Sequence, residues 1–284
     1  MKRGFFLFLL AGCMLFLPVC AKRWTQGFRI AKIQLDLPFH PEWEVAKIDH
    51  LDQILSQPYS YLSKGAQCYV FVSQDGQYVL KLFRFDPHLN PLRSFFRTVF
   101  KKKKIRTPFE AKVLRVFNAC KLAFEMAPEE TGLIYIHLNP TSDKLPPLLC
   151  KDPIGRSCRI PLESARFALQ KRAQPFRKTF LDAIKSGDPA QVETRIDEFL
   201  ALLRSRTGKG IGNSDPNLSR NFGFLEDQAV EFDFGNYSYS PAMLQPASQR
   251  REIEHYANRL RRWLKRTAPE WIPYLDEKLT TEKK

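Results

Sequence analysis

The most constraining feature of this sequence is a strand–turn–strand pattern over residues 62–81 that ends on a lysine within an apolar run. β-Branched and aromatic residues from 69 to 74 predict one strand, and residues 77–83 predict the returning strand. Between them, Asp75-Gly76 is typical of a hairpin turn, because glycine adopts positive φ without steric cost. Lys81 lies in the second apolar run, where an ammonium group needs an anionic partner such as a phosphate or a carboxylate.

This stretch resembles the start of the protein-kinase-like fold, in which a glycine-rich loop LGxGxxGxV precedes a hairpin that ends in VAIK. The corresponding residues here are LSKGAQCYV, beginning at Leu62, and VLK, ending at Lys81. Only Gly65 keeps its glycine, while Ser63 and Cys68 occupy the outer glycine positions. The resemblance implies that Gly65 approaches the phosphates of a nucleotide and that Lys81 binds them.

A second group of motifs, over residues 210–235, extends this resemblance. The family places a catalytic Asp, then an Asn, then Asp-Phe-Gly. Asp215, Asn221 and Asp233 occur in that order, and Phe-Gly follows Asp233. Short apolar strands are expected at 222–225 and 229–232, on either side of a turn. The resemblance implies that Asp215 accepts the proton of the substrate hydroxyl and that Asn221 and Asp233 bind Mg²⁺.

The sequence departs from the family pattern in three places. The His-Arg-Asp triplet reads Asn213-Ser214-Asp215, Asn221 lies six rather than five residues after Asp215, and no Ala-Pro-Glu follows the Asp-Phe-Gly. The chain after that motif is also short. These departures favour a compact, atypical member, similar to aminoglycoside- or sugar-kinase-like phosphotransferases, or a degenerate relative that does not catalyse.

Residues 107–126 predict a helix, because Thr107 can cap it and Pro108 suits its first turn. Its apolar residues recur at helical spacing, at positions 109, 113, 116, 117, 120 and 124. In the family that it resembles, this helix supplies a Glu that pairs with the strand lysine, which makes Glu110 the candidate partner of Lys81. The alternative is an ordinary Glu that the positive end of the helix dipole favours.

Residues 1–21 predict a targeting segment, because Lys2 and Arg3 precede an uncharged stretch from Phe5 to Ala21. Three interpretations remain open. The segment is a cleavable signal peptide, an uncleaved membrane anchor, or a lipoprotein signal in which Cys13 is lipidated. Each of them predicts an exported or membrane-anchored protein. This prediction conflicts with the kinase resemblance, because ATP is scarce outside the cytoplasm.

A formal net charge of +15 favours anionic partners, among them nucleotides and acidic membrane surfaces. Residues 86–106 are an insertion relative to the resemblance. Apolar positions at helical spacing from residue 92 and the cations through 104 predict a basic amphipathic helix over 92–106 that binds an anionic membrane surface. The alternative is a helix packed on the small lobe with its lysines in solvent. No nucleic-acid module or zinc spacing occurs, so we expect no nucleic-acid partner.

The remaining pattern predicts strands at 28–37, 132–138 and 148–151, and a hinge that contacts adenine near 150–159. Helices are predicted at 162–184, 189–206 and 252–266. Cys150 and Cys158 bracket a turn and are expected to pair if the compartment is oxidising.

These observations predict an α+β, two-lobed protein-kinase-like fold, with a small antiparallel N-lobe over 22–161 and a helical C-lobe over 162–284. The function predicted is an ATP- and Mg²⁺-dependent phosphotransferase whose acceptor, a protein or a small molecule, is unknown. The alternative is an exported or membrane-associated pseudokinase that acts as an interaction module. A third hypothesis, an exported protein with no nucleotide role, requires the motif order to be accidental.

Overall fold

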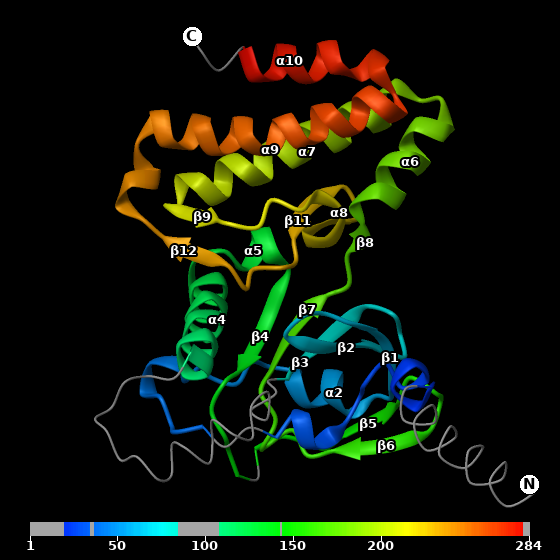
Figure 1. Cartoon of the computed structure of the whole chain (residues 1–284), viewed down its shortest axis with the longest axis vertical. Coiled ribbons are helices and arrows are strands. Elements are labelled where there is room, and N and C mark those ends of the chain that lie inside the picture. The colour runs from blue at the N-terminus through cyan, green and yellow to red at the C-terminus, as the bar shows by residue number, and fades with distance from the viewer. Residues whose placement is uncertain (1–19, 35–36, 85–107, 143, 281–284) are drawn as a thin grey trace, which may run out of the picture. The chain divides into compact units, whose positions relative to one another are not determined.

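The structure is a computed structural model that describes residues 20–34, 37–84, 108–142 and 144–280 (Figure 1). The chain divides into two compact units. Of the described residues, the first unit contains 20–34, 37–84, 137–142 and 144–168, and the second unit contains 108–136 and 169–280.

A seven-stranded mixed sheet, in the order β4-β7-β3-β2-β1-β5-β6, is the main element of the first unit. The boundary between the units falls within β4 and β7. The strands are β1 (Tyr59–Lys64), β2 (Cys68–Ser73), β3 (Tyr78–Phe83), β4 (Leu133–His137), β5 (Leu148–Lys151), β6 (Ser157–Ile160) and β7 (Phe167–Lys171).

The hairpin predicted on either side of Asp75-Gly76 is confirmed. Strands β2 and β3 pair antiparallel, with Val70 opposite Lys81. Side chains alternate along β2, so that Tyr69, Phe71 and Ser73 are buried. Gly76 has a φ of +73°, as the turn requires.

Two predictions for the first unit are wrong. The sheet is not antiparallel throughout, because β1 pairs with β5 in parallel, with Tyr59 opposite Cys150. Residues 150–159 form no hinge, since β5 and β6 are an antiparallel hairpin. Its turn is closed by Asp152, whose Oδ1 accepts the N–H groups of Ile154 and Arg156 at 3.0 and 2.9 Å. These hydrogen bonds close a tight turn, so the segment is a hairpin and not the hinge that the sequence resemblance predicts.

Cys150 and Cys158 are directly opposite each other in this hairpin. Their Sγ atoms lie 2.7 Å apart, and both cysteines are free thiols. Burial raises the pKa of both thiols, which keeps them protonated near neutral pH.

The strand predicted at 28–37 is also wrong over its described residues, which contain the 3₁₀ helix η1 (Ile30–Lys32). Residues 35 and 36 lie outside the described part of the chain. Ile33 is the buried apolar residue among the described residues of this segment, and Gln34 makes a single antiparallel bridge with Ala165. The ring of Phe28 meets those of Tyr69 and Phe71 edge-on at 5.0 and 5.8 Å. The segment that follows contains η2 (Pro41–Trp43) and α2 (Leu51–Ser56).

The second unit is mainly helical, and in Figure 1 its helices α7 and α9 lie side by side. Its longer helices are α4 (Pro108–Met126), α6 (Phe176–Ser186), α7 (Pro189–Gly208), α9 (Pro246–Thr267) and α10 (Ile272–Thr280). Its shorter elements are α5 (Pro128–Thr131), α8 (Leu218–Asn221), β8 (Gln174–Pro175), β9 (Ile211–Asn213), β10 (Phe222–Leu225), β11 (Gln228–Glu231), β12 (Tyr237–Tyr239), η3 (Pro241–Leu244) and η4 (Pro269–Trp271).

The predictions of helices at 107–126, 189–206 and 252–266 are confirmed by α4, α7 and α9, while Thr107 lies outside the described residues. The helix predicted at 162–184 is wrong over its first half. Residues 167–170 are all buried in β7, which lies between β4 and β3 in the sheet. A strand buried on both faces has no alternation, so its apolar run has no period that distinguishes it from a buried helix.

Candidate functional site

The six candidate residues are distributed over both units. Gly65 and Lys81 belong to the first unit, and Glu110, Asp215, Asn221 and Asp233 belong to the second. Lys81 is half-buried on β3, and its neighbours Leu80 and Leu82 are fully buried. Glu110 is half-buried in the first turn of α4. The pairing of Lys81 with Glu110 stays a prediction.

Gly65 lies in the tight turn that joins β1 to β2. Its N–H group donates to the carbonyl oxygen of Cys68 at 3.0 Å. The guanidinium of Arg84 donates to the carbonyl oxygens of Gly65 and Ala66 at 3.0 and 3.3 Å. The same guanidinium lies 5.0 Å from the ring centre of Tyr69. Arg84 therefore holds the carbonyl side of this loop in place, and the sequence patterns gave no sign of that role.

Asp215, Asn221 and Asp233 are brought together within the second unit by hydrogen bonds. The Asn221 side-chain amide donates to the carbonyl oxygen of Asp215 at 2.7 Å. The N–H group of Asp233 donates to the carbonyl oxygen of Asn221 at 3.3 Å. Asn221 is buried, Asp215 is half-buried, and Asp233 is exposed. The cluster thus combines a fixed amide with two carboxylates that remain accessible to a ligand.

The hairpin β10–β11 positions two of these residues, because Asn221 directly precedes β10 and Asp233 follows shortly after β11. Its register places Phe222 opposite Glu231. A Cβ atom at Gly223 would lie 2.4 Å from the carbonyl oxygen of Gln174, on the neighbouring strand β8. Only glycine permits this close approach, so Gly223 allows β10 to pair with both neighbours.

A buried ion pair anchors the loop that carries Asp215. Arg206, near the end of α7, donates to Glu231 at 2.8 Å, and the two side chains are fully buried. Glu231 in turn accepts the side-chain amide of Asn213 at 2.7 Å. The oxygen of the same side chain, Asn213 Oδ1, accepts the N–H group of Asp215 at 2.9 Å. The buried pair is therefore connected to the backbone of Asp215 through a single side chain.

Further polar groups complete this network. The second guanidinium nitrogen of Arg206 donates to Glu252 at 2.9 Å. The hydroxyl of Tyr237 donates to Glu231 at 2.9 Å, and that of Tyr256 donates to the carbonyl oxygen of Asn213 at 3.1 Å. Burial and the charge of Glu231 raise the pKa of Tyr237 well above its ordinary value, so its hydroxyl stays a donor. Burial by itself lowers the pKa of Arg206, but the charge of Glu231 outweighs that effect and raises it.

Sequence reasoning missed this network entirely. The sequence patterns place Arg206 at the end of a helix and Glu231 in a strand, and Asn213 stands where the family has a histidine. The one available signal was Glu231 itself, a carboxylate within the apolar segment 229–232.

The donor set of the cluster fits Mg²⁺. Hard cations prefer oxygen ligands, which the carboxylate of Asp233 and the amide oxygen of Asn221 supply. Among the described residues, no group of three or more His, Cys, Asp or Glu side chains could hold a metal ion. Two protein ligands are nevertheless the usual arrangement for Mg²⁺ in nucleotide sites, where phosphates and waters complete the coordination.

Two predictions fall outside the part of the chain that the structure describes. These are the targeting segment, of which residues 1–19 are undescribed, and the basic helix at 92–106. None of the described helices has the length and apolar character needed to cross a membrane.

No family model matches this sequence, and comparison with curated proteins finds no match. Solved structures of WbdD show a distant similarity. A high-resolution crystal structure of WbdD gives a TM-score of 0.38 at 13% identity, covering 70% of this chain and 37% of that chain. A structure described as the bifunctional kinase-methyltransferase WbdD gives a TM-score of 0.35 at 16% identity, covering 68% and 34%. This chain therefore matches little more than a third of the length of WbdD.

Proposed function

We propose that this protein is an ATP- and Mg²⁺-dependent phosphotransferase of protein-kinase-like fold. The observation that carries the proposal is the hydrogen-bonded cluster of Asp215, Asn221 and Asp233. These residues match the family motif in order, and they meet although six to twelve residues separate them along the chain. The departures in the sequence leave this cluster intact, because Asn213 holds Asp215 by its backbone N–H group.

In the proposed reaction, the chain's task is to position reactants and balance charge. Lys81 binds the α- and β-phosphates, and Glu110 orients its ammonium group. Asn221 and Asp233 would hold Mg²⁺, which would supply positive charge against the phosphates of the nucleotide. Asp215 accepts the proton of the acceptor hydroxyl as its oxygen bonds to the γ-phosphorus. The bond from that phosphorus to the β-phosphate oxygen breaks, and ADP leaves.

Thermal unfolding of the full chain in detergent, with and without MgATP, tests nucleotide binding. A ligand at 100 times its Kd stabilises a protein by about 2.7 kcal/mol. At this chain length, that corresponds to a rise in Tm of roughly 5–10 °C. We expect Lys81→Met and Asp233→Asn to abolish the rise.

Asp227→Asn is the matched control, because Asp227 is an exposed carboxylate in the turn of the same hairpin. It should leave the rise intact. The proposal fails if millimolar MgATP does not stabilise the wild-type protein, or if Asp227→Asn removes the effect as completely as Asp233→Asn.

The second candidate function is a pseudokinase that acts as an interaction module. The loop around Gly65 favours it, because the Gly65 N–H group is already bonded to Cys68 and is not directed at a phosphate. The two functions differ in turnover. A phosphotransferase with a suitable acceptor releases ADP, and Asp215→Asn abolishes this release while preserving the thermal shift. Nucleotide binding without turnover across acceptor classes supports the pseudokinase.

A further inference from the structure

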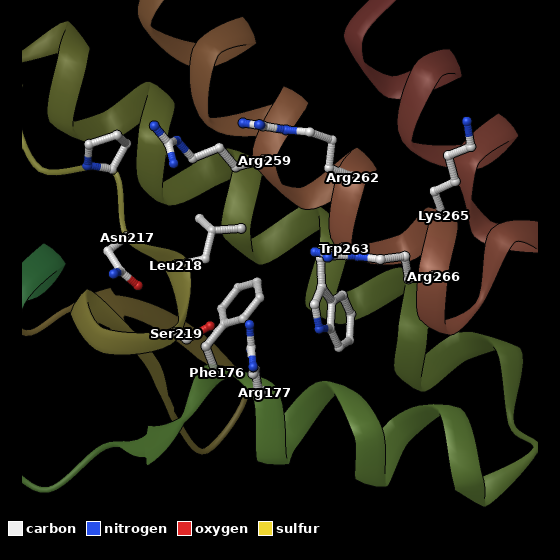
Figure 2. Close-up of a pocket in the computed structure, with 11 residues that line it drawn as sticks. Phe176, Arg177, Asn217, Leu218, Ser219, Arg259, Arg262, Trp263, Lys265 and Arg266 are labelled. Atoms are coloured by element: carbon white, nitrogen blue, oxygen red, sulfur yellow. The ribbon is translucent and has the colours of Figure 1, made fainter.

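A concave basic pocket lies within the second unit, next to the loop that follows Asp215. It has a volume of about 500 Å³, within the range of small-molecule sites. The side chains drawn in Figure 2 come from three segments: the start of α6, residues 216–219 that lead into α8, and the second half of α9. Its cations are Arg177, Arg259, Arg262, Lys265 and Arg266, and no carboxylate lines it.

The pocket arginines of α9 are not explained by pairing with carboxylates of the described residues. Arg259, Arg262 and Arg266 recur at spacings of three and four residues, so they share one face of the helix and repel one another. Among the described residues, no carboxylate pairs with any of the three. Arg261, on the same helix but outside the pocket, shows the contrast, because it pairs with Asp276. The helix dipole favours Lys265 and Arg266 in the last turn but not Arg259, which is two turns earlier.

The rest of the lining narrows the class of ligand. Guanidinium groups match the oxygen geometry of phosphate, and four of the five cations are arginines. Ser219 and Asn217 add neutral hydrogen-bonding groups from the loop. The rings of Phe176 and Trp263, whose centres are 6.3 Å apart, form an apolar wall that suits the non-ionic body of a ligand. A volume of about 500 Å³ is the size of a compact phosphorylated molecule.

We propose that this pocket binds a small molecule with clustered phosphate groups and that this molecule is the acceptor in phosphoryl transfer. Pro216 and Asn217 line the pocket and directly follow Asp215 in the chain, so a ligand held here lies next to the segment that carries the candidate proton acceptor. The binding step follows from the pocket alone. The acceptor role rests on the proposed function.

Titration of the full chain in detergent with myo-inositol hexakisphosphate tests the binding step, with the fluorescence of Trp263 and calorimetry as readouts. The double variant Arg262→Glu/Arg266→Glu reverses two exposed pocket cations. Loss of each charge-assisted contact weakens binding by about tenfold. Because two such contacts are lost, the double variant should bind about a hundredfold more weakly.

The matched control is Arg250→Glu/Arg251→Glu, which makes the same charge change on exposed residues of α9 outside the pocket. It should bind the probe as the wild type does. Equal weakening in both variants means that net charge alone attracts the probe, and it overturns the proposal. Absence of probe binding to the wild type overturns it as well.

A second arm separates a soluble ligand from a lipid headgroup. Vesicles of phosphatidylcholine with and without phosphatidylinositol bisphosphate are compared across the same variants, so that any contribution of residues 1–21 is common to all. The small-molecule assignment is overturned if the protein binds the vesicles through Arg262 and Arg266 but does not bind the soluble probe.

The two proposals can fail separately. Lys81→Met should lose the MgATP response and keep probe binding, while the pocket double variant should do the reverse. Probe binding without any MgATP response would remove the proposed function and leave the pocket as a phosphate-binding site.

Discussion

Replacing Arg206 with methionine tests how the buried network supports the candidate site. Arg206 and Glu231 are fully buried, so the substitution leaves a buried carboxylate without its counter-charge. Removing one partner of such a pair costs about 3–5 kcal/mol. For a chain of this size, we expect Tm to fall by roughly 6–20 °C. Methionine has a similar volume, which keeps the contribution of a cavity small.

The matched control is Arg261→Met, in which another arginine of the second unit loses an ion pair. Its partner Asp276 is about half exposed, at 46%. Pairs of this kind contribute about 0–1 kcal/mol, so this variant should unfold nearly as the wild type does. Urea denaturation of both variants at pH 7, followed by circular dichroism, gives the comparison.

The double variant Arg206→Met/Glu231→Gln separates stability from positioning. The introduced glutamine side chain carries no charge, and its single oxygen can still accept from one of Asn213 and Tyr237, which donate to different oxygens of Glu231. Because the fully buried charge of Glu231 is removed, part of the lost stability should return, although Glu252 still lacks its partner. The reasoning is refuted if Arg206→Met costs no more than Arg261→Met, or if the double variant is less stable than Arg206→Met alone.

Three other features of the structure make predictions that can be measured directly. Gly223→Ala should destabilise the second unit by about 1–3 kcal/mol, because its Cβ atom meets the carbonyl oxygen of Gln174; urea unfolding showing no loss would mean that β8 simply moves aside. Oxidation with diamide should join Cys150 to Cys158, protect both from maleimide and stabilise the protein by about 2–3 kcal/mol. Cys158→Ser should prevent the disulfide, and maleimide labelling of both thiols after oxidation would contradict the prediction. Burial lowers the pKa of His137 from 6.5 to about 4, so the unfolded state binds the proton first and stability should fall as pH drops from about 6.5 to 4. The loss is up to about 3 kcal/mol, and urea titrations at each pH should show it reduced in His137→Gln; an unchanged slope in that variant would assign the effect to other groups.

Several elements of this protein were determined by local sequence. The hairpin at 68–83 needed only alternating side chains and an Asp-Gly turn, and the structure has both. Helices α4, α7 and α9 were predictable because their apolar residues recur with the helical period, and that face is the one that becomes buried. The order of Asp215, Asn221 and Asp233 is given by the sequence itself, and their role in a metal site stays a prediction.

Other elements were decided by partners distant along the chain. Strand β7 lies between β4 and β3 and is buried on both faces, so its side chains carry no periodic signal. The parallel pairing of β1 with β5 joins segments about 90 residues apart, and hydrophobic pattern does not specify such a partner.

The buried network around Arg206 and the basic pocket also arose only in the tertiary structure. Arg206, Glu231 and Asn213 come from a helix and two strands, and nothing in the local sequence links one to another. By their spacing alone, the cations of α9 are typical of a solvated helix face. Only the tertiary structure places α6 and residues 216–219 beside them to form a pocket. Periodicity and turn chemistry are properties of a single segment, so the sequence by itself determined the elements that depend on them. Burial and the proximity of charges depend on how segments pack together, so only the tertiary structure decided them.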